Sequence, residues 1–240
     1  MSFVLELARV SKRFGALTVT DDISFAVRPG ETYGILGPNG AGKTTLFNLI
    51  SGDIRPDSGK VSFDGADIAH LPPHRRCVAG IGRSYQVPRP FGGMTVFENL
   101  LVGATFGGAR REPEAYDLCV QVLARTGLGK KANQLAGGLT LLDRKRLELA
   151  RALATQPRLL LLDEIAGGLT EAETHALIDE IRQVKASGIT IVWIEHVMHA
   201  LLAVADRLLV INFGRKIAEG APATVLEDAE VRRVYLGLEA

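Results

Sequence analysis

A glycine-rich run near residue 40 has the residue types and spacing of a phosphate-binding loop. It fits the pattern G-x-x-x-x-G-K-[ST], in which the glycines let backbone N–H groups point inward at phosphate oxygens. Lys43 is suited to reach the β- and γ-phosphates of a nucleotide, and Thr44 to place its hydroxyl on Mg²⁺. The pattern predicts that a nucleotide is bound by Gly37, Pro38, Asn39, Gly40, Ala41, Gly42, Lys43, Thr44 and Thr45.

Two carboxylates follow an apolar segment further along the chain. Residues 159–162 are all leucine, and Asp163 and Glu164 come directly after them. Ligands of parallel sheets bind at the carboxyl ends of the strands. We therefore expect Asp163 to orient Mg²⁺ and Glu164 to polarise a water for attack on the γ-phosphate. The alternative is a solvated acidic turn after a buried strand, and the phosphate loop upstream makes it the weaker interpretation.

Two further polar residues are expected to end strands, and one of them, His196, at the same edge of the sheet as Asp163 and Glu164. His196 follows an apolar run and can hydrogen-bond a γ-phosphate, although a lone histidine at a strand end is more often structural. Gln86 is predicted to end a strand through residues 82–86, where its amide can contact Mg²⁺ or the attacking water. A polar strand end without a catalytic role is the other interpretation of Gln86.

The elements that position these residues are of two kinds. Residues 3–10 and 17–27 alternate apolar and polar side chains, which is typical of half-buried antiparallel strands. Residues 32–36, 159–162 and 189–194 are short unbroken apolar runs, which favour parallel strands covered on both faces. Other short strands are predicted at residues 60–64, 82–86, 207–211 and 215–219.

Helical signals lie between and after these strands. A capping box joins Thr95 to Glu98, and a second one begins at Thr170. Helix starts are predicted at Thr95, Pro113, Thr140, Thr170 and about Ala229, besides the helix after the phosphate loop. We expect an α/β fold with a mostly parallel sheet and an N-terminal antiparallel β subdomain. Residues 1–87 and 157–240 would form this core, and residues 88–156 an inserted helical subdomain.

Composition excludes several classes of protein. The 240 residues suffice for one large domain, and a formal charge of +1 gives no basic surplus for a nucleic-acid partner. Cys77 and Cys119 have no metal-like spacing, which favours a reducing, cytosolic compartment. The first six residues lack the basic and apolar regions of a signal peptide. The longest apolar stretch, residues 197–213, is interrupted by charged residues, so any membrane link is expected to go through another protein.

In their order and spacing, these segments resemble the ATP-binding subunit of an ABC transporter over essentially the whole chain. Residues 37–45 match the Walker A loop, and residues 159–164 match the Walker B strand with its catalytic glutamate. Gln86 matches the Q-loop and His196 the switch histidine, while Phe14 falls where the family stacks an aromatic ring on adenine. The resemblance implies a P-loop NTPase core that hydrolyses ATP with Mg²⁺.

The signature segment departs from the family pattern, which is usually Leu-Ser-Gly-Gly-Gln. Counting back from the Ala-Arg-Ala-Leu at residues 150–153 places it at residues 139–143. Thr140 keeps the serine hydroxyl and suits a helix N-cap, whereas Leu141 and Leu142 replace the glycines. The resemblance implies that these three residues approach the γ-phosphate of ATP held by the opposite subunit.

Three other segments bear on the resemblance. Residues 135–139 look like the signature, but we interpret them as a decoy because they lie too far from the helix that should follow. Residues 168–171 occupy the D-loop, and Ile165 stands where the family usually has proline.

The finer resemblance is to ATPase subunits of branched-chain amino acid importers. It is carried by residues 83–86, 94–100, 146–151 and 231–237. It implies as partners a second ABC ATPase subunit, transmembrane permease subunits and, indirectly, a periplasmic solute-binding protein. The chain would be peripheral at the cytoplasmic face of the inner membrane. The alternatives are the ATPase of a lipid or lipopolysaccharide exporter and a soluble ABC ATPase.

The segment after Gln86 is the predicted coupling surface. It is rich in proline and glycine, and Phe91 and Met94 have no helical or strand period that explains their apolar character. Packing of Phe91 under the helical insertion is an equally weighted alternative.

Overall fold

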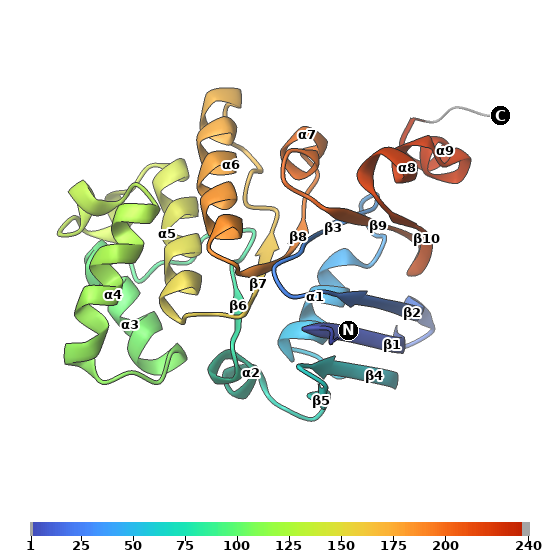
Figure 1. Cartoon of the computed structure of the whole chain (residues 1–240), viewed down its shortest axis with the longest axis horizontal. Coiled ribbons are helices and arrows are strands. Elements are labelled where there is room, and N and C mark those ends of the chain that lie inside the picture. The colour runs from blue at the N-terminus through green and yellow to red at the C-terminus, as the bar shows by residue number, and fades with distance from the viewer. Residues whose placement is uncertain (1, 237–240) are drawn as a thin grey trace.

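Two β-sheets form the framework of the computed structural model, which describes residues 2–236 (Figure 1). The larger sheet has the order β10-β9-β3-β8-β7-β6. Its strands are β3 (Thr32–Leu36), β6 (Ile81–Arg83), β7 (Leu159–Asp163), β8 (Thr190–Ile194), β9 (Arg207–Asn212) and β10 (Arg215–Gly220). All neighbours pair in parallel except β9 with β10. The expected mostly parallel sheet is therefore confirmed.

The smaller sheet is antiparallel, as the alternating N-terminal pattern predicts. Its order is β2-β1-β4-β5, with bounds Leu17–Val27, Leu5–Phe14, Ser58–Phe63 and Ala66–Asp67. Helix α1 (Lys43–Ser51) packs its apolar side chains into one core cluster with residues of both sheets. This packing holds the loop that precedes α1 between the two sheets.

Strand β7 shows why an unbroken apolar run forms a central strand. Successive side chains of a strand point to opposite faces. Leu159 and Leu161 belong to the core cluster shared with α1, whereas Leu160 and Leu162 belong to the cluster on the other face. Both faces of β7 are thus covered, and the strand has no solvent side on which a polar residue would be favourable.

The helices largely follow the capping signals. Their bounds are α2 Pro73–Ala79, α3 Val96–Val102, α4 Glu112–Arg125, α5 Leu141–Ala154, α6 Glu171–Ala186, α7 Met198–Leu202, α8 Pro222–Glu227 and α9 Ala229–Leu236. The capping boxes at Thr95 and Thr170 are formed, and Thr140 caps α5 by accepting from the Asp143 N–H. The sequence analysis missed α2, α7 and α8.

Helices α3, α4 and α5 lie together at one end of the molecule, away from the antiparallel sheet (Figure 1). They contact one another within residues 88–156 and share a core cluster with one face of the larger sheet. The division of the chain into a core and a helical subdomain with these limits stays a prediction. Of the C-terminal segment 231–237, Gly237 lies outside the described residues.

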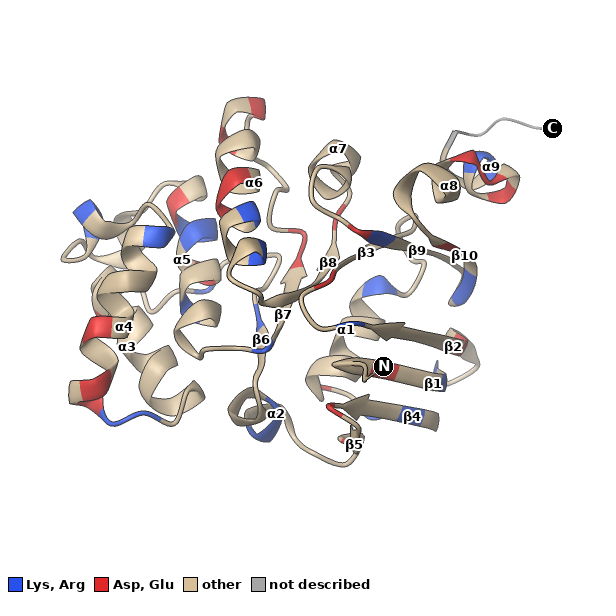
Figure 2. Ribbon diagram, in the orientation of Figure 1, with Lys and Arg blue, Asp and Glu red and all other residues tan. Residues whose placement is uncertain are grey.

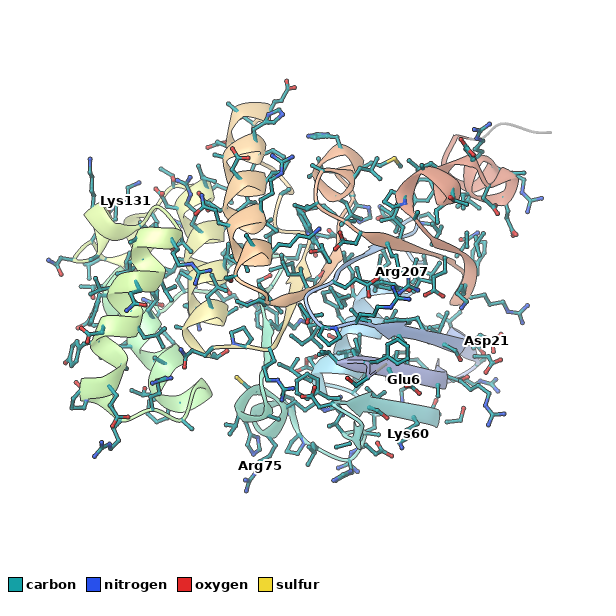
Figure 3. The ribbon with its side chains drawn as sticks, viewed as in Figure 1. Glu6, Asp21, Lys60, Arg75, Lys131 and Arg207 are labelled. Atoms are coloured by element: carbon teal, nitrogen blue, oxygen red, sulfur yellow. The ribbon has the colours of Figure 1, made fainter. Side chains whose placement is uncertain are left out.

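A half-buried charge connects the two sheets. Arg207, labelled in Figure 3, projects from β9, and its guanidinium pairs with Glu31 at 3.1 Å and with Glu219 of β10 at 2.5 Å. The same group donates to the carbonyl of Ala26 in β2 at 3.2 Å. Because one planar group satisfies acceptors from β2, from β10 and from the residue before β3, it helps to orient the antiparallel sheet against the parallel one.

Candidate functional site

The glycine-rich loop connects β3 to α1 in the strand–loop–helix arrangement that the motif requires. Gly42 has φ of 100°, and a Cβ atom there would lie 2.4 Å from the carbonyl oxygen of Val19. A Cβ at Gly37 would lie 2.5 Å from the carbonyl oxygen of Ile211. Both positions therefore exclude any side chain, and the loop keeps its backbone free to face a ligand.

Lys43, the first residue of α1, folds back into this loop. Its side chain is only 5% exposed, and Nζ donates to the carbonyl oxygens of Gly37 at 2.7 Å and Pro38 at 3.0 Å. Burial lowers the pKa of Lys43, and the charges of Glu164 and Asp163 oppose that shift. The next residue, Thr44, is exposed in the first turn of α1. The ammonium group thus lies within the loop, where it can meet phosphate oxygens.

Asp163, the last residue of β7, forms an ion pair that the sequence analysis missed. Its Oδ2 lies 2.9 Å from Nη2 of Arg83, and both side chains are nearly buried. Nη1 of Arg83 also donates to the side chain of Asn48 in α1 at 2.7 Å. Arg83 therefore ties the end of β6 to the end of β7 and to α1. The sequence signal that could have identified Arg83 is a charged residue within a strand that is otherwise buried.

Glu164 lies at the centre of the predicted catalytic residues. Oε1 is 2.7 Å from Nε2 of His196, and Oε2 accepts from Nε2 of Gln86 at 2.5 Å. Its backbone has a φ of 46°, a left-handed conformation that is uncommon for a side chain of this size and is often found at functional sites. The structure therefore brings Gln86, Glu164 and His196 together, and it places Glu164 and His196 after neighbouring strands, as expected.

The predicted position of Gln86 at a strand end is wrong. Strand β6 ends at Arg83, and Gln86 lies in the loop beyond it. The carbonyl oxygen of Gln86 accepts a hydrogen bond from Nζ of Lys145 and not from β7. The side chain still reaches Glu164, because the loop turns toward the end of β7.

A buried carboxylate beside His196 was also missed. Glu195 is 1% exposed and accepts from the backbone N–H groups of Ala166 at 2.7 Å and His196 at 2.9 Å. Burial raises the pKa of Glu195. The Glu195 carboxylate joins the segment after β8 to Ala166 in the segment after β7, which keeps His196 beside Glu164. Acidic positions follow both β7 and β8 in Figure 2.

The interpreted signature lies at the start of α5. Thr140 accepts from the Asp143 N–H, and Asp143 pairs with Lys131, which is labelled in Figure 3. Leu141 is exposed, and a Cβ at Gly168 would lie 3.4 Å from its Cδ2. Residues 136–138, within the interpreted decoy, form a short 3-10 helix before this start. The role of Thr140, Leu141 and Leu142 toward a second subunit stays a prediction.

Phe14 is the last residue of β1 and is half exposed. Nζ of Lys12 lies 5.6 Å from the centre of its ring. An exposed aromatic face of this kind is available for stacking, and its contact with adenine stays a prediction.

The three predicted metal ligands carry oxygen donors of the kind that suits Mg²⁺. The Thr44 hydroxyl, the Asp163 carboxylate and the Gln86 amide are the hard ligands that this ion prefers.

Basic and acidic positions are interspersed over the molecule in Figure 2. Among residues 2–236, no helix combines the length and the apolar character that crossing a bilayer requires.

Comparison with known proteins gives matches along the whole chain. A family model described as ABC transporter matches residues 20–167, and one described as branched-chain amino acid ATP-binding cassette transporter matches residues 215–240. The chain is 35% identical to the high-affinity branched-chain amino acid transport ATP-binding protein BraF of Pseudomonas aeruginosa, over 98% of each chain. It is 36% identical to LivG of Escherichia coli K12, with the same coverage.

Solved structures agree with these matches. An ATP-binding cassette of an ABC transporter in its ADP conformation has a TM-score of 0.89 and 33% identity, covering 99% of this chain and 100% of that one. A nucleotide-free ATP-binding cassette has the same TM-score with 32% identity and the same coverage.

Proposed function

The chain belongs to the ATP-binding subunits of the ABC transporter family and is an ATPase, and we propose that it powers uptake of branched-chain amino acids. The contact of Glu164 with both Gln86 and His196 carries the proposal for the reaction, because it joins a carboxylate that could act as a base to two side chains that could contact the γ-phosphate or the water. Full-length similarity to BraF and LivG, whose names specify this transport, supports the cargo. The exporter and soluble alternatives are not favoured by these relatives.

The reaction assigns a separate task to each residue. Lys43 offsets the charge of the β- and γ-phosphates, and Glu164 accepts a proton from the attacking water. The water oxygen bonds to the γ-phosphorus as the bond to the bridging oxygen breaks, which leaves ADP and phosphate. His196 donates to the γ-phosphate oxygens, and Gln86 holds the water or the ion. Thr44, Asp163 and Gln86 would hold Mg²⁺, which when bound would supply further positive charge beside the phosphates.

Two partners follow from this proposal. A second ATPase subunit would present its signature segment to the ATP held by Lys43, so that two subunits enclose two nucleotides. Transmembrane permease subunits would dock on the peripheral chain at the cytoplasmic face of the inner membrane and receive cargo from a periplasmic solute-binding protein. These permease subunits supply the membrane spans.

A groove of about 350 Å³ between α2, the loop after β6 and the helical segment supports the docking proposal. Tyr85 and Phe106 line it, and Phe106 is 81% exposed. Large apolar side chains exposed beside a groove favour burial against a protein partner.

Uptake of radiolabelled leucine tests the function. Cells that carry this chain with its permease subunits should accumulate leucine, and cells that carry the Glu164→Gln chain should not. Purified transporter should show ATPase activity that the leucine-loaded binding protein stimulates. Normal uptake with the Glu164→Gln chain would contradict the proposed reaction, whereas ATPase without leucine uptake would contradict only the cargo.

A further inference from the structure

Three charged side chains of α5 hold the backbone of the loop that follows β6. Nζ of Lys145 donates to the carbonyl oxygen of Gln86 at 2.7 Å. Oε1 of Glu148 accepts from the N–H of Arg89 at 2.8 Å, and Nη1 of Arg151 donates to the carbonyl oxygen of Arg89 at 3.0 Å. We call Lys145, Glu148 and Arg151 the α5 clamp. Their spacing of three residues places them along one side of the helix.

Lys145 alone of the three also contacts the backbone of Glu164. Its Nζ also donates to the carbonyl oxygen of Glu164 at 3.1 Å. Because the side chains of Gln86 and Glu164 are themselves joined at 2.5 Å, the three residues form a closed ring of hydrogen bonds. The ammonium group of Lys145 binds the backbone carbonyl oxygens of Gln86 and Glu164, and the side-chain amide of Gln86 binds the carboxylate of Glu164.

The position of Lys145 argues against an incidental surface contact. The residue is 3% exposed, although an unpaired ammonium group is costly to remove from water. Two carbonyl oxygens accept from it, and burying them without a donor would carry its own cost. A charged group buried between the helical segment and two catalytic loops therefore has a specific local function.

We propose that Lys145 is a positioning residue for ATP hydrolysis, which holds Gln86 and Glu164 in their productive arrangement and transmits movement of α5 to both. This inference rests on the proposed role of Glu164 as the base. Glu164 has a left-handed backbone, and such a conformation persists only where its surroundings hold it. Lys145 supplies one of those restraints at the carbonyl of Glu164, and the Glu164 N–H donates to Ile194 at the other end of the residue.

The ring of hydrogen bonds explains how α5 can influence the reaction through Lys145, although Lys145 itself need not contact the nucleotide. The helix begins at the interpreted signature and carries the clamp on its next turns. A rotation of α5 moves Nζ of Lys145, and with it the backbones of Gln86 and Glu164. A change of about 1 Å in such a group lowers a rate by about 100-fold.

The experiment compares four variants in the assembled transporter: Lys145→Met, Lys145→Arg, Glu164→Gln and the double variant Lys145→Met/Glu164→Gln. Methionine keeps much of the buried volume and removes the donors. We expect Lys145→Met to lower kcat by about 10- to 100-fold while KM for ATP changes by less than about threefold. Lys145→Arg should recover much of the rate, because a guanidinium also offers several donors.

The double variant separates positioning from general loss of structure. If Lys145 acts through Glu164, its removal adds little to the loss in Glu164→Gln, because residues that act as a unit are not additive. Hydrogen exchange should also increase at residues 86–89 in Lys145→Met. Lys185→Met is the control. Lys185 is a half-buried lysine that donates to the carbonyl oxygen of Val204 at 2.8 Å and pairs with Asp206 at 2.6 Å, and it makes no bond to the ring.

The outcomes are distinct. An unchanged kcat in Lys145→Met, or fully additive losses in the double variant, would overturn the positioning role. An unchanged kcat in Glu164→Gln would instead contradict the proposed base. If Lys145→Met does not fold, Lys145→Arg decides. A melting temperature, a kcat and a hydrogen exchange equal to those of the parent protein support the proposal. A kcat equal to that of the parent with raised exchange at residues 86–89 contradicts it.

Discussion

The imidazole Nε2 of His196 lies 2.7 Å from Oε1 of Glu164. The two residues follow the neighbouring parallel strands β8 and β7, in which Asp163 is paired with Ile194. Glu195 fixes the backbone between them by accepting from the N–H groups of Ala166 and His196. We expect a γ-phosphate that enters here to compete with Glu164 for the N–H of His196, which is the basis of the sensing role predicted for this histidine.

Removal of this imidazole should slow hydrolysis. We expect His196→Ala to lower kcat by about 10- to 100-fold, the contribution of one hydrogen bond to a charged group. ATP binding should be retained because Lys43 and the loop are unchanged. His199→Ala is the control, since His199 is also exposed on the chain after β8. Equal rates for the two variants would assign His196 a structural role.

Lys43→Ala should abolish productive ATP binding. The β- and γ-phosphates lose their compensating cation, and the carbonyl oxygens of Gly37 and Pro38 lose their donor. Titration with a fluorescent ATP analogue measures the loss. Lys60→Ala, at an exposed position of β4, should bind as the parent does. Near-normal ATPase activity of Lys43→Ala in the assembled transporter would refute the loop assignment.

Glu164→Gln should keep ATP binding and slow hydrolysis by about 10²–10⁴-fold, the usual contribution of a general base. Two subunits with bound ATP should then stay closed, and size-exclusion chromatography with ATP and Mg²⁺ should show the pair. The matched change Asp179→Asn, at an exposed position of α6, should have no such effect. Unchanged turnover would move the base to another residue.

Phe91→Glu should uncouple ATP hydrolysis from transport. The ring is 44% exposed and lies 4.9 Å from the Arg151 guanidinium, so the residue is both accessible and attached to the α5 clamp. We expect leucine uptake to fall while ATPase activity and the melting temperature are kept. Val120→Glu, exposed on α4, is the control. Cross-linking to the permease that never involves residues 88–100 would contradict the coupling role.

Two different ATPase subunits in one transporter should give unequal sites. Leu141 and Leu142 stand at the interpreted signature, where the family usually has glycines, and we expect their side chains to crowd the backbone near the partner's nucleotide. If the partner has an intact serine–glycine–glycine signature, Glu164→Gln in this chain should remove most of the steady-state ATPase activity. The equivalent change in the partner should remove much less. Equal losses, or an assembly of two copies of this chain, would defeat this prediction.

Local chemistry accounts for the features that the sequence predicted well. The strand–loop–helix setting of Lys43, the capping boxes at Thr95 and Thr170, and the cap at Thr140 depend on residues within a few positions of one another. The unbroken apolar run of β7 likewise predicted a strand covered on both faces. The order of these segments predicted the sheet edge at which Glu164 and His196 meet.

Only the tertiary structure decided which charged groups surround that edge. The pairing of Arg83 with Asp163, the place of Glu195 and the ring through Lys145 join segments that are far apart in the chain. Their energies depend on burial and on distances of a few ångströms, which no periodic pattern records. The end of β6 shows the same limit. The sequence determined that a strand lies before the loop but not where it ends: the strand was predicted to run to Gln86 and ends at Arg83, and the carbonyl oxygen of Gln86 accepts from the distant Lys145.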